Sequence, residues 1–268
     1  MTDLTFTTLD TGPSTLDKTV TLVSGDTEAV LVDAGFTRAD GHRAVAEILD
    51  SGKELTTVFI SAGDPDFYFG AEVVQDAFPN ARFVAPADVI DHIDHSYDKK
   101  LEAWKNLGVN LPTRRVTLEA FTSDTITVDE QVLELRNADL DPHNRGWFLF
   151  DPATRTVVGG VLVFSGLHVW TADSSTPELR QKWIAGLDTV EALNPTTVIA
   201  GHRSAGAAAD GAALAHTRDY LKNFERIVGE KENGAEVEKA LLAEYPDAGL
   251  AVAAHLGALV AKGEMAWG

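Results

Sequence analysis

Two aspartates only two positions apart give the first indication of chemistry in this chain. Asp64 and Asp66 follow an apolar, β-branched run that predicts a short buried strand at 57–61. Gly63 and Pro65 end that strand in a turn. Two neighbouring carboxylates without a metal repel each other, so one should titrate high and act as a general acid or base near neutral pH.

His202 is the second candidate for proton transfer. It follows a strand predicted at 197–200, and an imidazole exchanges protons near neutral pH. Each residue also has a structural interpretation, with Asp66 as a cap of the following helix and His202 as a hydrogen-bonded core residue. The sequence leaves the catalytic and structural interpretations open for Asp64, Asp66 and His202.

The elements that position these residues can be predicted from periodicity and turn formers. Strands are expected at 4–9, 19–23, 29–32, 57–61, 81–85, 114–118, 124–128, 131–136, 147–150, 156–164 and 197–200. Helices are expected around 45–52, 73–79, 89–93, 96–107 and 176–190, and again from 210 onward. Two runs of strands, each followed by helices, predict an α/β (α+β) architecture, a four-layer αβ/βα sandwich. With no repeat or linker, we expect a single domain over 1–268.

Composition restricts the class of protein. The 268 residues are 44% hydrophobic and 24% charged, which is ordinary for a globular protein. The formal net charge of −19 argues against binding to nucleic acid or to a membrane surface. The absence of cysteine excludes thiolate chemistry. No apolar run is long enough to span a bilayer, and residues 1–10 lack an export signal, so we expect a cytoplasmic protein.

Four stretches together resemble the metallo-β-lactamase fold. They are Leu31-Val32-Asp33-Ala34-Gly35, the turn at 61–70, the run at 157–164, and Ile199-Ala200-Gly201-His202. The resemblance covers about residues 4–205, and the remainder, 206–268, looks like the helical C-terminal extension that hydrolase-like members of this superfamily often carry.

The resemblance implies two zinc ions, held by a His-x-His-x-Asp-His motif on the turn and by three later positions. In this chain these positions are occupied by Ala62, Asp64, Asp66, Phe67, Ala138, Val161 and His202. Four of these side chains are apolar and cannot coordinate a metal, so we expect no metal and no other cofactor. A single ion held by Asp64, Asp66 and His202 remains an alternative.

Five further residues are candidates for substrate binding. Phe67 and Tyr68 could form an aromatic wall beside the turn, or pack under the helix. His143 lies on the polar loop 137–145 and could reach the site, although the sequence favours a surface position for it. His168 and Trp170 follow the strand at 156–164, in a segment that borders the substrate mouth in this fold.

These observations lead to one main hypothesis and two alternatives. The main hypothesis is a metal-independent enzyme that uses acid–base chemistry for elimination, cyclisation or water-assisted cleavage of a small, possibly aromatic, organic molecule. Asp64 and His202 are the expected proton-transfer pair, with Asp66 in support. The alternatives are a non-catalytic small-molecule binder and the one-metal hydrolase. The apolar stretch 250–260 is a possible homodimer surface or an internal cap.

Overall fold

The computed structural model describes residues 3–141 and 145–267, and its first half is a six-stranded sheet. The strands lie in chain order: β1 (Thr5–Asp10), β2 (Thr19–Ser24), β3 (Glu28–Val32), β4 (Glu54–Phe59), β5 (Arg82–Ala85) and β6 (Glu119–Ala120). The first three are antiparallel and the others pair in parallel. Helices connect the parallel strands: α1 (Arg38–Ser51), α2 (Pro65–Tyr68), α3 (Ala71–Ala77) and α4 (Ala87–Ala103).

The second half is built around a five-stranded sheet in the order β12-β10-β9-β8-β7. Its strands are β7 (Thr125–Val128), β8 (Gln131–Asn137), β9 (Trp147–Asp151), β10 (Thr156–Val158) and β12 (Thr197–Ile199). Helix α5 (Pro177–Glu191) covers its outer face, and α5 begins at Thr176-Pro177 as predicted, since the Thr176 hydroxyl accepts the Leu179 backbone N–H.

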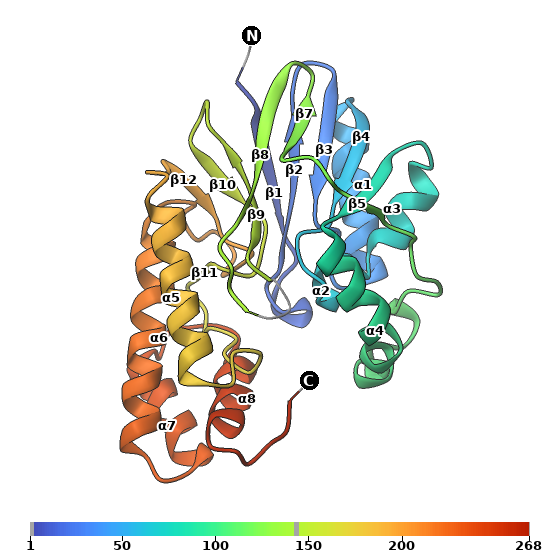
Figure 1. The fold of residues 1–268 in the computed structure, drawn as a ribbon. Helices are drawn as coiled ribbons and strands as arrows, with labels where there is room; N and C mark the ends of the chain where they lie inside the picture. Colours follow the sequence, from blue (N-terminus) through green and yellow to red (C-terminus); the bar gives the residue numbers. More distant parts are fainter. Residues whose placement is uncertain (1–2, 142–144, 268) are drawn as a thin grey trace.

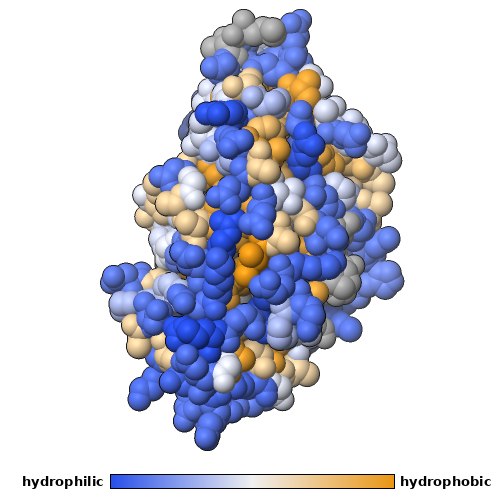
Figure 2. All heavy atoms as spheres, turned by 60° about the vertical axis from the view of Figure 1, so that its left-hand side comes forward, coloured by the Kyte–Doolittle hydropathy of each residue, from blue (hydrophilic) through white to orange (hydrophobic). Residues whose placement is uncertain are grey.

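The two sheets face each other across an apolar layer, with helices outside both (Figure 1). That layer takes residues from both sheets, among them Val30 and Phe59 from the first and Leu149 and Ile199 from the second. The four-layer αβ/βα sandwich is therefore as predicted. Hydrophilic residues cover most of the face that carries α5 and α6, with only small apolar patches between them (Figure 2).

The strand predicted at 156–164 is interrupted, and the interruption positions His202. Gly159 and Gly160 have φ of 84° and 80°, so the ladder of β10 stops before them. The chain resumes as β11 (Phe164–Ser165), which pairs in parallel with β13 (His202–Arg203). A Cβ atom added at Gly201 would lie 2.0 Å from the Gly160 carbonyl oxygen, so the backbones approach closely just before His202.

Two other predicted elements differ from the structure. Residues 114–118 form no strand, because the Glu72 carboxylate accepts backbone N–H groups of Thr113 and Arg114 and holds the segment as a loop. The helices predicted at 89–93 and 96–107 are one helix, α4, followed by the 3-10 helix η2 (Lys105–Asn110). Ser96 does not break α4, since its hydroxyl donates to the carbonyl of His92 one turn earlier.

Three helices follow β13: α6 (Ala212–Glu230), α7 (Gly234–Glu244) and α8 (Ala251–Ala261). They agree with the helical extension predicted for 206–268, while the single-domain assignment stays a prediction. The apolar side of α8 is largely buried within the chain, at Ala253, Ala254 and Ala258. Within residues 3–141 and 145–267, no helix has the length and apolarity needed to cross a membrane.

Candidate functional site

Asp66 and His202 form the centre of the candidate site. Asp66 lies in α2 and His202 in β13, and the Asp66 Oδ2 atom is 3.3 Å from His202 Nε2. Both side chains are nearly buried, with 7% and 6% of their surface exposed. The imidazole stacks on the Phe164 ring at 4.8 Å between centroids, and the Phe67 ring meets it edge-on. The pair is therefore rigidly held.

The hydrogen bonds of His202 decide which of its nitrogens can exchange a proton. Nδ1 lies 3.0 Å from the carbonyl oxygen of Leu16, which can only accept, so Nδ1 carries a hydrogen. Nε2 is then the nitrogen that faces Asp66. Nε2 and the Asp66 Oδ2 atom are therefore the two atoms of the pair that face each other, at 3.3 Å.

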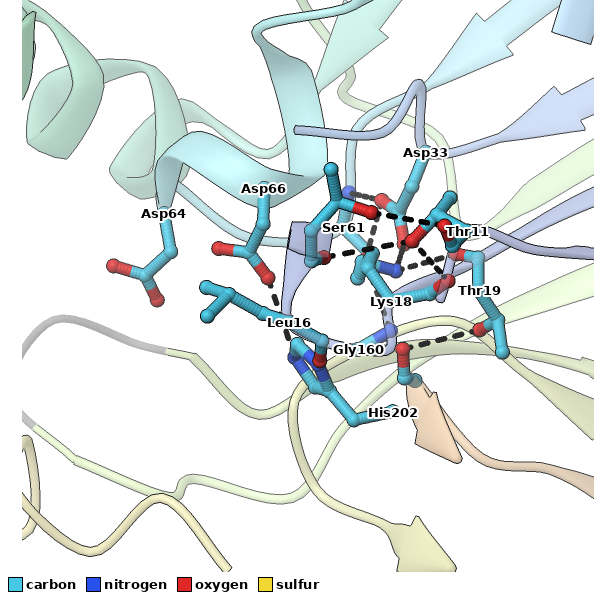
Figure 3. A network of polar contacts seen from close by, with 12 residues as sticks. Thr11, Leu16, Lys18, Thr19, Asp33, Ser61, Asp64, Asp66, Gly160 and His202 are labelled. Atoms are coloured by element: carbon cyan, nitrogen blue, oxygen red, sulfur yellow. Dashed lines mark hydrogen bonds and ion pairs between the residues drawn. The ribbon is translucent and has the colours of Figure 1, made fainter. Parts of the chain in front are cut away.

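A buried ion pair lies beside this centre (Figure 3). Lys18 Nζ is 2.9 Å from Asp33 Oδ2, and the two side chains are 0% and 1% exposed. The ammonium also donates to the Thr19 carbonyl at 2.7 Å and lies 4.1 Å from the centroid of the Phe67 ring. The sequence analysis missed Lys18, because nothing in the sequence indicates that an isolated lysine before a strand is fully buried.

Next to this ion pair, hydrogen bonds from Asp33 through Ser61 to Gly160 join the two halves of the molecule (Figure 3). Asp33 Oδ1 accepts the Ser61 backbone N–H at 2.9 Å and the Ser61 hydroxyl at 2.7 Å. The Ser61 oxygen in turn accepts the backbone N–H of Gly160 at 2.9 Å. This chain of contacts fixes the start of the turn that carries Asp66 against the second half.

Asp64 points away from Asp66 and His202 and pairs with Lys100 of α4. Lys100 Nζ donates to Asp64 Oδ1 at 3.1 Å and to the Gly63 carbonyl at 2.7 Å, and it lies 2.9 Å from His92 Nε2. Burial opposes ionisation of Asp64, but the charges of Lys100, Arg145 and His92 outweigh it and lower its pKa to about 2.

The prediction that a carboxylate of this turn titrates near neutral pH is therefore wrong for Asp64. That prediction considered only the repulsion between two aspartates. Lys100 lies far away in the sequence, and its ammonium reverses the direction of the shift.

The residues present do not fit the zinc ions that the fold implies. Ala62, Phe67, Ala138 and Val161 are buried and apolar at positions where metal ligands are expected. Within the part of the chain that the structure describes, no three His, Cys, Asp or Glu residues are grouped so as to hold a metal. Asp64, engaged with Lys100, does not join Asp66 and His202 in such a group.

The predicted substrate-binding residues occupy different places. Phe67 and Tyr68 are buried, and Tyr68 packs on Phe69 and Tyr97. This arrangement agrees with packing inside the protein and not with an exposed aromatic wall. His168 is fully buried, with Nδ1 3.1 Å from the Tyr220 hydroxyl, and burial lowers its pKa.

Trp170 is half-buried and lies against Trp267, with ring centroids 5.8 Å apart. His143 lies outside the described residues.

Arg145 is a further residue that the sequence analysis did not single out as a site residue. It is buried, its Nε pairs with Asp141, and its Nη1 lies 3.1 Å from Asp173 Oδ2. Its charge also contributes to the lowered pKa of Asp64. The sequence gives no indication of this burial, because an arginine side chain in a polar loop is expected to be exposed to solvent.

Comparison with known families identifies the class of protein. The family model of the metallo-β-lactamase superfamily matches residues 15–202, which is more than half of the chain. The chain therefore belongs to the metallo-β-lactamase superfamily, as its four sequence stretches indicated. No curated protein sequence matches it.

Solved structures agree on the fold. A metallo-β-lactamase family protein from Thermus thermophilus is similar with a TM-score of 0.64 and 14% identity, over 97% of this chain and 93% of that one. A metallo-β-lactamase from Pontibacter korlensis is similar with a TM-score of 0.59 and 17% identity, over 82% and 94%. At these identities the likeness shows the fold alone.

Proposed function

We infer that this member of the superfamily is an enzyme that transfers protons without a metal ion, through Asp66 and His202. The observation that carries this inference is the contact of 3.3 Å between Asp66 Oδ2 and His202 Nε2. The other ring nitrogen of His202, Nδ1, is hydrogen-bonded to the Leu16 carbonyl. Such a pair can take a proton from a substrate and return it to another atom of that substrate. Asp64, held as an anion by Lys100, positions the turn.

The apolar replacements support the metal-independent part of the proposal. A zinc hydroxide needs at least three donors around an open position, and buried Ala62, Phe67 and Val161 supply none. The reaction classes that remain are those driven by proton transfer alone: elimination, cyclisation or water-assisted cleavage. The proposed substrate is a small organic molecule.

The experiment is a screen of small organic molecules with chelator-treated protein, read by mass spectrometry of the products. We expect turnover to persist in chelator and to fall sharply in Asp66→Asn and His202→Ala. Stoichiometric zinc by elemental analysis, with activity lost in chelator, would contradict the metal-independent proposal. A ligand that raises the melting temperature but is never converted would indicate the non-catalytic binder.

A further inference from the structure

Segments far apart in the sequence meet at Asp173. Trp170 and Asp173 lie in the loop between β11 and α5, and Trp267 lies in the segment after α8, which turns back toward the middle of the molecule (Figure 1). The Trp267 Nε1–H donates to Asp173 Oδ1 at 2.8 Å. The charges of Asp64 and Lys100 also act on the pKa of Asp173, Asp64 raising it and Lys100 lowering it.

The loop that carries Asp173 is held by two buried arginines. Arg180 Nη1 donates to the Ser174 carbonyl at 2.7 Å, and Arg145 Nη2 donates to the Ser174 hydroxyl at 3.4 Å. The Ser174 backbone N–H closes a turn onto the Thr171 carbonyl at 3.0 Å. A loop fixed at Ser174 presents its neighbour Asp173 in one position, as a binding site requires.

The Asp173 carboxylate is partly exposed and has two partners, the Arg145 guanidinium and the Trp267 N–H. It is 27% exposed, and its cationic contact is the Arg145 guanidinium, which is shared with Asp141. Burial raises the pKa of Asp173, Arg145 lowers it and Asp64 raises it, and the net direction is upward. Its exposed part can attract a cation from solvent.

The two tryptophans offer ring faces next to this carboxylate. Trp170 and Trp267 are tilted by 59° with centroids 5.8 Å apart, so their faces are not stacked on each other. Trp267 is 39% exposed. Indole faces attract cations most strongly among aromatic side chains, and the net charge of −19 favours the approach of a cation.

We propose that Trp170, Trp267 and Asp173 form a binding subsite for an organic cation, a protonated amine or a quaternary ammonium. The proposal deepens the proposed function, on which it rests for the claim that the bound cation is the substrate. The ring faces receive the alkylated nitrogen and Asp173 supplies the counter-charge. The binding itself requires neither Asp66 nor His202.

Calorimetric titration with choline and with 3,3-dimethylbutan-1-ol tests the proposal, because the alcohol has the same shape and no charge. We expect choline to bind at least tenfold more tightly than the alcohol. Asp173→Asn, which keeps an acceptor for Trp267, should weaken choline binding about tenfold. Trp267→Leu should weaken it similarly, and Trp267→Phe less. Equal affinity for both compounds, or unchanged choline affinity in Asp173→Asn, would overturn the proposal.

Two controls separate this result from other effects. Asp188→Asn removes a carboxylate that pairs with Arg218 on the outer helices, and should leave choline affinity unchanged. His202→Ala should retain choline binding while losing turnover. Choline binding lost in Asp173→Asn but kept in His202→Ala supports the subsite whatever becomes of the proposed reaction. If Asp173→Asn does not fold, the partly exposed Trp267 variants decide the question.

Discussion

Asp66 and His202, which are 136 positions apart in the numbering, meet at 3.3 Å, whereas Asp64 turns away to Lys100. The turn after β4 thus separates two carboxylates that the sequence places side by side. One is joined to an imidazole and the other to an ammonium. The two aspartates therefore have different roles, and substitutions can distinguish them.

Asp66→Asn should reduce turnover by about 100-fold or more, because it removes the carboxylate that lies 3.3 Å from His202 Nε2 in the proposed proton-transfer pair. Asp64→Asn should reduce turnover much less, since Asp64 contacts Lys100 instead. Rates at saturating substrate provide the measurement, and melting temperatures check the fold. The assignment fails if Asp64→Asn is the more damaging substitution at equal stability.

Removing the carboxylate of Asp64 should alter the acid stability of the protein. Its folded pKa of about 2 lies below its ordinary value of 3.8, so ionised Asp64 stabilises the fold above about pH 4. That contribution, about 2 kcal/mol, is lost as the pH falls toward 2. Denaturant unfolding at pH 5 and pH 2.5 should show a smaller loss in Asp64→Asn than in the wild type. Equal losses would contradict the lowered pKa.

Lys18→Met should destabilise the protein by about 3–5 kcal/mol, because it leaves the Asp33 carboxylate buried without its cation. Lys105→Met is the matched control, since Lys105 pairs with Glu102 on the exposed surface and should change stability by less than about 1 kcal/mol. Equilibrium unfolding in denaturant measures both values. Similar small effects in the two variants would show that the buried ion pair adds little.

Gly201→Ala should disturb the position of His202 and destabilise the fold, because the added Cβ would meet the Gly160 carbonyl oxygen at 2.0 Å. Gly229→Ala adds a methyl group in α6 where nothing lies within 4 Å, and should be neutral or stabilising by up to about 1 kcal/mol. Thermal unfolding and the NMR signals of the imidazole give the two readouts. Unchanged His202 signals in Gly201→Ala would argue against the close approach.

Much of the fold could be predicted, because the two runs of strands and the helix starts depend on local signals. Thr176-Pro177 opens α5 and the turn residues after 60 close β4, both as the sequence indicates. The split of the strand at 156–164 was missed, although Gly159-Gly160 was its visible signal. The sequence could not show that the Glu72 carboxylate accepts hydrogen bonds from the backbone at 113–114, because this contact joins residues about forty positions apart.

The sequence names both Asp66 and His202 as candidates, but it favours Asp64 as the partner of His202, and the structure places Asp66 there. Asp66 and His202 come from the two halves of the sandwich, and the family resemblance placed them together. Asp64 was assigned the wrong electrostatic environment, because Lys100 reaches it from a helix whose orientation the sequence does not define. Burial of Lys18 depends on Asp33 and Phe67, two contacts that no spacing rule predicts.

The hydrogen bond from the Gly160 N–H to the Ser61 oxygen links the two halves, and it would be broken if the protein were produced as two separate fragments. A cut between β6 and β7 would separate Ser61 and Asp66 from Gly160 and His202, so neither fragment would contain the complete site. Fragment complementation should therefore restore activity only when both pieces reassociate, and its recovery would report the docking of one sheet on the other.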